Sequence, residues 1–205
     1  MIQKITYRDQ VRKLLLDKMK TGELLAGNSL SLASIARELE VSVTPIREAL
    51  TQLEYSRIIK YIPNRGFIIP ELNDSKAKNL YQLVANLEAL AIENSVYSKS
   101  TITKLKKQQK EIENAKSAID RINADIKFHN ILTSEYDNQT AQQILLDLKT
   151  RIFFYEVEFM KHQQFHKNSK HHHHLIIEYI ENGKIKEAVE LVKINWLQIL
   201  DFMKL

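Results

Sequence analysis

The sequence of 205 residues contains no cysteine, which excludes disulfides, thiolate nucleophiles and zinc fingers with cysteine ligands. A composition of 44% apolar and 27% charged residues is that of a globular protein that can bury the core of one large domain or two modest ones. No apolar run approaches the roughly 20 residues that span a bilayer, and the first residues lack the core of a signal peptide, so we expect a cytoplasmic protein without membrane contact.

The net charge of +5 is concentrated in the first third of the chain. Residues 1–70 hold 11 Lys and Arg against seven Asp and Glu, a net of +4, whereas residues 71–205 hold 19 against 18. Glycine and proline follow the same division, because only Gly183 lies beyond Pro70. A basic N-terminal region of short elements suits a module that faces phosphates, although a solvated basic face explains such a charge as well.

Three short helices are expected in this N-terminal region, each marked by an apolar stripe or a cap. The stripe of the first helix comprises Tyr7, Val11, Leu14, Leu15 and Met19. Ser31 is placed to cap the second helix, and Ser42 or Thr44 to cap the third. Pro45 falls in the first turn of the third helix, where its missing N–H costs nothing.

A β-hairpin is expected to follow the three helices. Its strands are predicted at residues 58–62 and 67–69, and residues 63–66 between them contain the proline and glycine of a turn. Three helices followed by one hairpin form a winged helix-turn-helix, which we expect at residues 1–70. Residues 71–74 then form a short linker.

The remaining segment, residues 75–205, shows no strand signal and is expected to be an all-helical bundle, so the fold class is mainly α. About six helices are expected there, near residues 75–98, 101–117, 119–136, 139–165, 169–182 and 184–204. Gly183 interrupts the pattern between the last two helices and predicts that they form an antiparallel pair.

The segment from Ser42 to Leu50 carries the most specific signal in the sequence. Short hydroxyl residues at a helix start leave backbone N–H groups free to meet a phosphate, and Arg47 lies about one turn further on, within reach of a guanine edge or a phosphate. Taken singly, Arg47 could instead pair with a neighbouring acid. At the tip of the hairpin, Arg65 is placed to enter a minor groove. The expected DNA contacts are Ser42, Thr44, Pro45, Arg47, Asn64, Arg65 and Gly66.

These motifs resemble the DNA-binding domain of the GntR family of transcription regulators. The matching stretches, in the order and spacing of the family, are residues 20–24, 35–39, 41–50 and 65–67. The resemblance implies that the N-terminal domain binds double-stranded DNA. Glu40 stands where the family usually has glycine, and Ala33 and Val43 stand where it often has DNA-contacting arginines. Base reading would then depend on Arg47 and Thr44.

Helical phase directs four polar residues of the C-terminal domain toward its core. Asp125 and His129 are spaced i, i+4, so both leave the same face of one helix. His173 and Asn195 lie on the apolar faces of the last two helices, roughly level across the turn at Gly183. Neutral imidazoles and a carboxylate suit a divalent transition ion such as zinc (Zn), nickel (Ni) or manganese (Mn). The alternative is a metal-free bundle in which these groups bind each other or a small-molecule effector.

This layout resembles the ligand-binding domain in the FadR branch of the GntR family, where an Asp-x-x-x-His pair and two further histidines hold a metal. Asp125, His129 and His173 match that pattern, whereas Asn195 replaces the last histidine. An amide oxygen is a weaker ligand than imidazole for such ions, so the metal affinity should be lower. The resemblance also implies a small organic acid as effector, for which Arg151 is a candidate carboxylate partner.

Together these patterns predict a DNA-binding transcriptional regulator and not an enzyme, namely a ligand-responsive repressor that binds a palindromic operator as a homodimer. One alternative is a helical metal-dependent hydrolase that uses Asp125, His129 and His173 around an activated water. Its general base would be Glu88 or Glu156. Another is an architectural DNA-binding protein without an effector. Such a protein needs a broad basic surface, which the nearly neutral C-terminal domain lacks.

Overall fold

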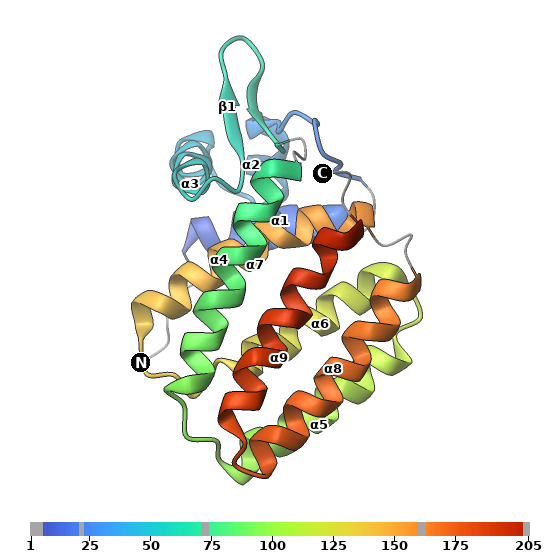
Figure 1. Ribbon diagram of the computed structural model, residues 1–205. Helices are drawn as coiled ribbons and strands as arrows, with labels where there is room; N and C mark the ends of the chain where they lie inside the picture. Colours follow the sequence, from blue (N-terminus) through green and yellow to red (C-terminus); the bar gives the residue numbers. More distant parts are fainter. Residues whose placement is uncertain (1–5, 21–22, 71–73, 160–162, 203–205) are drawn as a thin grey trace. The chain divides into compact units, whose positions relative to one another are not determined.

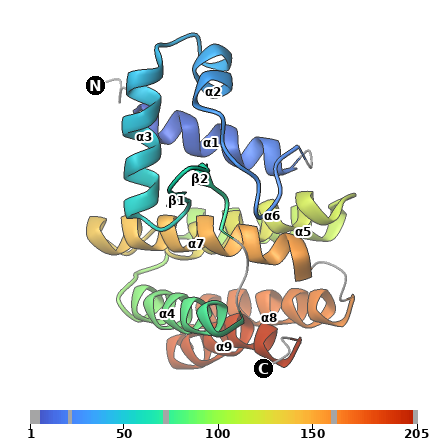
Figure 2. The same ribbon diagram turned by 90° about the horizontal axis from the view of Figure 1, so that it is seen from above.

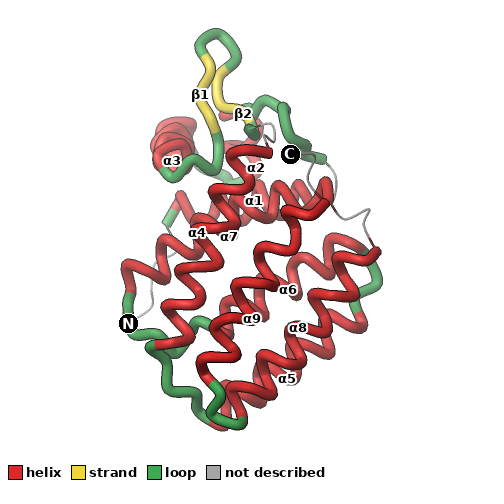
Figure 3. The backbone as a smooth tube through the Cα atoms, viewed as in Figure 1, coloured by secondary structure: helices red, strands yellow, loops and turns green. Residues whose placement is uncertain are grey.

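The computed structural model forms two compact units, residues 1–72 and 73–205, and the regular secondary structure of its described residues is helical apart from one small sheet (Figures 1 and 3). The described residues are 6–20, 23–70, 74–159 and 163–202. The prediction of a mainly α fold, with a winged helix-turn-helix followed by a helical bundle, is confirmed. Within the described ranges, no helix combines the length and the apolarity that a membrane-spanning segment needs.

Three helices build the N-terminal unit, in the order that the caps and apolar stripes predicted. They are α1 at Tyr7–Lys20, α2 at Leu32–Glu38 and α3 at Val43–Tyr55. Both α1 and α2 pack against α3. The residues that fill their common core are Val11, Leu15, Ile35, Ala36, Ile46, Ala49, Leu50 and Leu53. Tyr7, which the predicted stripe of α1 included, is instead 45% exposed, because it lies at the very start of the helix.

The turn between α2 and α3 explains why these helices begin and end where they do. Ser31 caps α2 as predicted, since its hydroxyl accepts the N–H of Ser34 at 3.2 Å. Ser42 holds the cap position of α3, but its hydroxyl forms no capping hydrogen bond. Between them Glu40 has a φ of 56°, the left-handed conformation that glycine adopts without strain. Glutamate in place of the usual glycine therefore leaves the turn intact but strained.

The wing consists of β1 at Lys60–Ile62 and β2 at Gly66–Ile68, which pair antiparallel. β1 is shorter than the predicted strand at residues 58–62, because Ile58 and Ile59 fill the core ahead of the sheet, whereas β2 has the predicted length but begins one residue earlier. The turn between them is tight, with φ values of 64° at Asn64 and 75° at Gly66. A third extended segment, which was not predicted, pairs with β2 through a bridge between Ser29 and Ile68.

The C-terminal unit is a bundle of six α-helices within the described residues. They are α4 at Asp74–Glu93, α5 at Lys99–Asn114, α6 at Ala118–Leu132, α7 at Gln139–Phe159, α8 at Gln163–Glu181 and α9 at Ile185–Leu197, followed by a 3-10 helix at Gln198–Phe202. Figure 2 shows two layers, with α4, α9 and α8 in one and α7, α6 and α5 in the other. Contacts of α4 with α7 and of α8 with α5 join the layers.

Several predicted helix boundaries in this unit are wrong. The helix expected at residues 139–165 ends at Phe159, and the next one begins at Gln163, not at residue 169. Residues 163–168 are mostly polar and carry no apolar stripe that could mark a helix start. The helix expected at residues 75–98 ends at Glu93, after which the next residues bond back to carbonyls four positions earlier. Of the predicted linker, only its last residue is described, and it begins α4.

Candidate metal centre and candidate nucleic-acid interface

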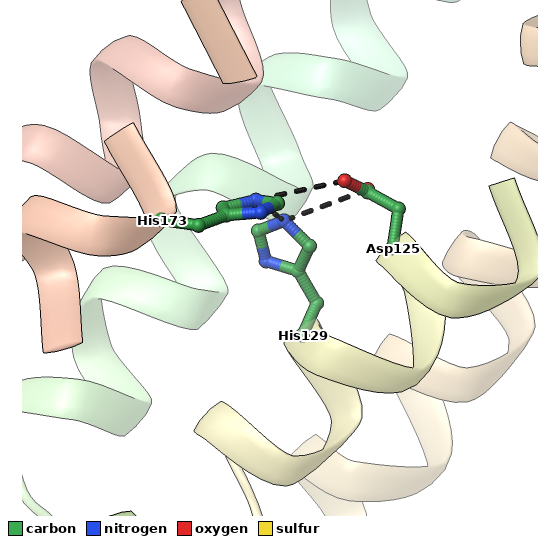
Figure 4. Close-up of side chains that lie close together, drawn as sticks. All are labelled: Asp125, His129 and His173. Carbon is green, nitrogen blue, oxygen red and sulfur yellow. Dashed lines mark hydrogen bonds and ion pairs between the residues drawn. The ribbon is translucent and has the colours of Figure 1, made fainter. Parts of the chain in front are cut away.

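Three metal-ligand side chains converge between the two layers of the helical bundle. Asp125 and His129 come from successive turns of α6, and His173 comes from α8 (Figure 4). Both histidines are fully buried, whereas the side chain of Asp125 keeps 18% of its surface exposed. One ligand atom from each residue lies within 4.8 Å of the other two. The structure therefore brings together the residues of two helices that helical phase had directed toward the core.

The distances within this cluster match those around a four-coordinate ion. The two Nε2 atoms of His129 and His173 are 3.3 Å apart. Two nitrogens that each lie about 2.0–2.1 Å from a tetrahedral zinc ion are separated by roughly 3.3 Å. The carboxylate oxygens of Asp125 lie 3.8 Å from His129 Nε2 and 3.6 Å from His173 Nε2. These residues fit a divalent ion with only small adjustments.

Asn195 of α9 completes the predicted set. Its amide nitrogen lies 3.4 Å from His129 Nε2 and 3.3 Å from His173 Nε2, and the residue is buried. Its amide oxygen accepts a hydrogen bond from Gln198 Nε2 at 3.2 Å. Because the amide nitrogen and oxygen have nearly the same shape, a half-turn of the group would present the oxygen to a cation. Asn195 therefore lies where its amide oxygen could reach a cation held by the two histidines.

Burial sets the protonation of the cluster. It lowers the pKa of His173 well below its ordinary value of 6.5, and the neighbouring His129 lowers it further. His173 is therefore neutral at pH 7, which is the form that binds a metal. Burial also raises the pKa of Asp125, although the charge of His129 opposes this shift. A bound cation would favour the ionised form of Asp125.

A second set of buried polar groups lies at Nδ1 of His129, the ring nitrogen that does not face the cluster. Glu88 of α4 accepts the Nδ1–H of His129 at 2.6 Å and the indole N–H of Trp196 at 2.7 Å, and it pairs with Lys149 of α7 at 2.6 Å. Burial alone would raise the pKa of Glu88, but His129 and Lys149 outweigh it and hold the value at about 2. Glu88 is thus an ionised carboxylate held by two hydrogen bonds and one ion pair.

Sequence reasoning missed the part that Lys149 and Trp196 play, and it considered Glu88 only as a general base. A signal for Lys149 existed, because a lysine there interrupts the buried stripe of Leu145 and Ile152 on α7. Arg151, the predicted effector contact, is half-buried two positions after Lys149. It therefore points about 200° away from that lysine around the helix. Its role stays a prediction.

The residues expected to contact DNA lie on one end of α3 and on the wing. Ser42, Thr44 and Arg47 are all exposed, whereas the opposite side of α3 is buried in the core. Among the described residues, no acid pairs with Arg47, so its guanidinium is available to a ligand. On the wing, Asn64 is exposed, and the guanidinium of Arg65 donates to the carbonyl of Gly27 at 3.4 Å. Pro45 and Gly66 are half-buried.

A winged helix-turn-helix that exposes Ser42, Thr44 and Arg47 at the start of α3, followed along the chain by a helical domain with a buried polar cluster, is the architecture of a two-domain transcription regulator. Comparison with known families agrees. Residues 7–69 match the family described as "Bacterial regulatory proteins, gntR family", and residues 79–195 match the FCD domain. The chain belongs to the GntR family of bacterial regulators and carries an FCD domain as its C-terminal, FadR-type part.

Individual relatives match different shares of the chain. The Bacillus subtilis HTH-type transcriptional regulator YdhC is 26% identical over 156 residues, which cover 73% of this chain and 68% of that protein. Escherichia coli McbR is 32% identical over 89 residues, but that match spans only 40% of its length. The solved structure of E. coli McbR has a TM-score of 0.78 at 20% identity over 97% of both chains. A GntR regulator from Rhodococcus sp. RHA1 also reaches 0.78, at 20% identity over 95% of both chains.

These comparisons make the chain a DNA-binding transcriptional regulator and exclude the hydrolase alternative, because the family and its named relatives are regulators and not enzymes. The geometry gives a physical reason as well. Glu88 is fully buried and held by two hydrogen bonds and one ion pair, so it cannot serve as a general base beside an open metal position. The side chain of Glu156, the other candidate base, lies outside the described residues.

Proposed function

We propose that this regulator is a ligand-responsive repressor whose FCD domain binds a divalent transition ion through Asp125, His129, His173 and Asn195. The observation that carries the proposal is the buried cluster itself, in which two imidazole nitrogens lie 3.3 Å apart beside a carboxylate. Zinc, nickel and manganese all accept such ligands. The bound ion would supply a Lewis-acidic centre to which the carboxylate of a small organic acid can bind.

The exposure of the ligands supports an effector route to this site. Asp125 is the ligand that retains solvent contact, at 18%, whereas His129 and His173 are fully buried. Ser169 of α8 donates to the Asp125 carboxylate at 3.4 Å. An organic acid would therefore approach the ion past Asp125, and Arg151 remains the candidate partner for its carboxylate.

We further propose that the N-terminal unit reads DNA with the start of α3 and touches the backbone or minor groove with the wing. Ser42 supports this, because its hydroxyl is not used for capping and is free to meet a phosphate. Arg47 is exposed one turn further along the same helix. The residues proposed to contact DNA are Ser42, Thr44, Pro45, Arg47, Asn64, Arg65 and Gly66.

A homodimer on a palindromic operator follows from the way helix-turn-helix domains bind two half-sites one helical turn apart. The exposed apolar side chains on the packed pair α4 and α9 are consistent with a second copy. Leu83 and Leu90 are 47% and 42% exposed, and Ile194 is 54% exposed. Size-exclusion chromatography with light scattering should give twice the chain mass; a monomer at micromolar concentration would contradict the dimer.

Substitution of Arg47 by alanine tests the DNA-binding proposal. We expect operator affinity to fall by roughly 5- to 150-fold, the effect of losing about 1–3 kcal/mol of base or phosphate contact. Lys13→Ala is the matched control, because it removes an exposed cation from α1 without touching α3. Fluorescence anisotropy with operator and scrambled duplexes measures both. An Arg47→Ala protein that binds the operator as tightly as the Lys13→Ala protein would overturn the assignment.

A further inference from the structure

The carboxylate of Glu88 lies where four helices of the FCD domain meet. It projects from α4 and is completely buried. His129 of α6 and Trp196 of α9 both donate to its Oε2, at 2.6 and 2.7 Å, and Lys149 of α7 lies 2.6 Å from its Oε1. A buried carboxylate with this many charge-assisted contacts is held rigidly.

These contacts determine which nitrogen of His129 carries a hydrogen. A carboxylate oxygen can only accept, so the hydrogen between Glu88 and His129 lies on Nδ1. The other nitrogen, Nε2, is the atom that faces the cluster, 3.8 Å from the Asp125 carboxylate and 3.3 Å from His173 Nε2. The ring of His129 is therefore fixed in the form whose Nε2 can bind a cation.

No described residue accepts a hydrogen bond from the second ring nitrogen of His173. Its Nδ1 is buried and has no hydrogen-bond partner among the described residues. Its ring is held instead by stacking on Phe128, with ring centres 4.2 Å apart and planes 22° from parallel. The two imidazoles of the cluster thus differ, and Glu88 acts on only one of them.

Lys149 offsets the energetic cost of burying the charge of Glu88. The lysine is 1% exposed, and within the described residues its ammonium contacts Glu88 and the side-chain oxygen of Asn130, the latter at 3.1 Å. A buried charge without a partner is strongly unfavourable, so each member of this pair requires the other. Together they add no net charge beside the cluster, which leaves Asp125 as its acidic ligand.

We propose that Glu88, with Lys149 as its counter-ion, is the positioning residue of the metal site: it fixes the Nδ1–H form of His129 and so aims Nε2 at the ion. This inference rests on the proposed metal-binding function of the cluster. A purely structural ion pair would join α4 to α7 but would leave the form of His129 unchanged. The two roles are therefore distinguishable by observing the ring directly.

The test uses the full-length protein without metal, labelled with ¹⁵N-histidine, at pH 8. Long-range ¹H–¹⁵N spectra report which ring nitrogen is protonated, and His129→Gln identifies the signal. In the wild type, His129 should be protonated at Nδ1. In the double variant Glu88→Leu/Lys149→Met, which removes the acceptor without leaving a buried charge, the Nε2–H form should appear. Glu135→Leu is the control, because it removes a carboxylate bonded to Ser98 and Thr101 elsewhere in the domain.

Zinc titration of the same proteins by calorimetry provides the second readout. The double variant should bind zinc 10- to 100-fold more weakly than the wild type, the usual effect of removing a group that orients a metal ligand, and Glu135→Leu should bind normally. If the double variant does not fold, Glu88→Gln replaces it, since the amide can offer one oxygen to either His129 or Lys149 but not to both.

A variant that keeps the Nδ1–H form, or that binds zinc within twofold of the wild type, would overturn the positioning role. If the wild type itself binds no zinc, the proposed metal function fails. The protonation of His129 in the double variant then decides alone whether Glu88 orients that ring.

Discussion

Replacement of Glu40 by glycine tests whether the turn between α2 and α3 is strained. The turn is a Schellman motif, in which the N–H of Val41 donates to the carbonyl of Ala36 at 2.9 Å and the N–H of Glu40 donates to that of Arg37 at 3.3 Å. This motif needs a left-handed residue directly after the helix cap, and Glu40 fills that position with a φ of 56°. Its side chain is exposed, so its removal costs no packing.

Two opposing terms set the expected change in the free energy of unfolding. A left-handed conformation costs a residue with a side chain about 1–2 kcal/mol. Glycine lowers the free energy of unfolding by about 0.4–1 kcal/mol, because it increases the conformational freedom of the unfolded chain. Glu40→Gly should therefore stabilise the N-terminal unit by roughly 0.5–1 kcal/mol, which raises the Tm of a small unit by roughly 2–8 °C.

Thermal unfolding followed by far-UV circular dichroism measures this change. The matched control is Glu48→Gly, because Glu48 is exposed in the interior of α3, where glycine destabilises a helix by about 1 kcal/mol. Trp196 is the single tryptophan and lies in the C-terminal unit, so its fluorescence follows the unfolding of that unit. The transition that it reports should have the same midpoint in the wild type and in both variants. A Glu40→Gly protein no more stable than the wild type would refute the strained turn.

Two further predictions concern the metal cluster. Zinc at 100 times its Kd should raise the free energy of unfolding by about 2.7 kcal/mol in scanning calorimetry, and His173→Gln should remove that gain; an unchanged Tm in the wild type would argue against a site. Asn195→His should bind zinc more tightly than the wild type, because imidazole is the better ligand, and Asn195→Leu more weakly. Equal affinities in a calorimetric titration of the three proteins would show that residue 195 does not contact the ion.

The N-terminal fold was predictable from sequence because its signals are local. Ser31 caps the helix that follows it, and Gly66 takes the positive φ that the hairpin turn requires. The strand pairing of Ser29 with Ile68 was missed, since the partners lie far apart in the chain and the segment around Ser29 is too short to show alternation.

The cluster was predictable because a histidine at a core position of a helix is a strong signal even when the partner helix is unknown. Phase alone directed His129, His173 and Asn195 inward, and the structure places all three together. The support from Glu88 and Lys149 was not predictable in the same way. A charged residue on an apolar stripe can be buried or can extend to solvent, and only the packing of α4 on α7 decides between them.

X-ray absorption at the zinc edge of the full-length protein tests the metal-binding proposal most directly. One equivalent of zinc should show a first shell of nitrogen and oxygen at about 2.0–2.1 Å with the scattering pattern of two imidazoles. The double variant His129→Gln/His173→Gln keeps the exposed histidines 171 and 174, so it reports any binding outside the cluster. If the wild type and this variant give the same spectrum, the buried cluster does not hold the ion.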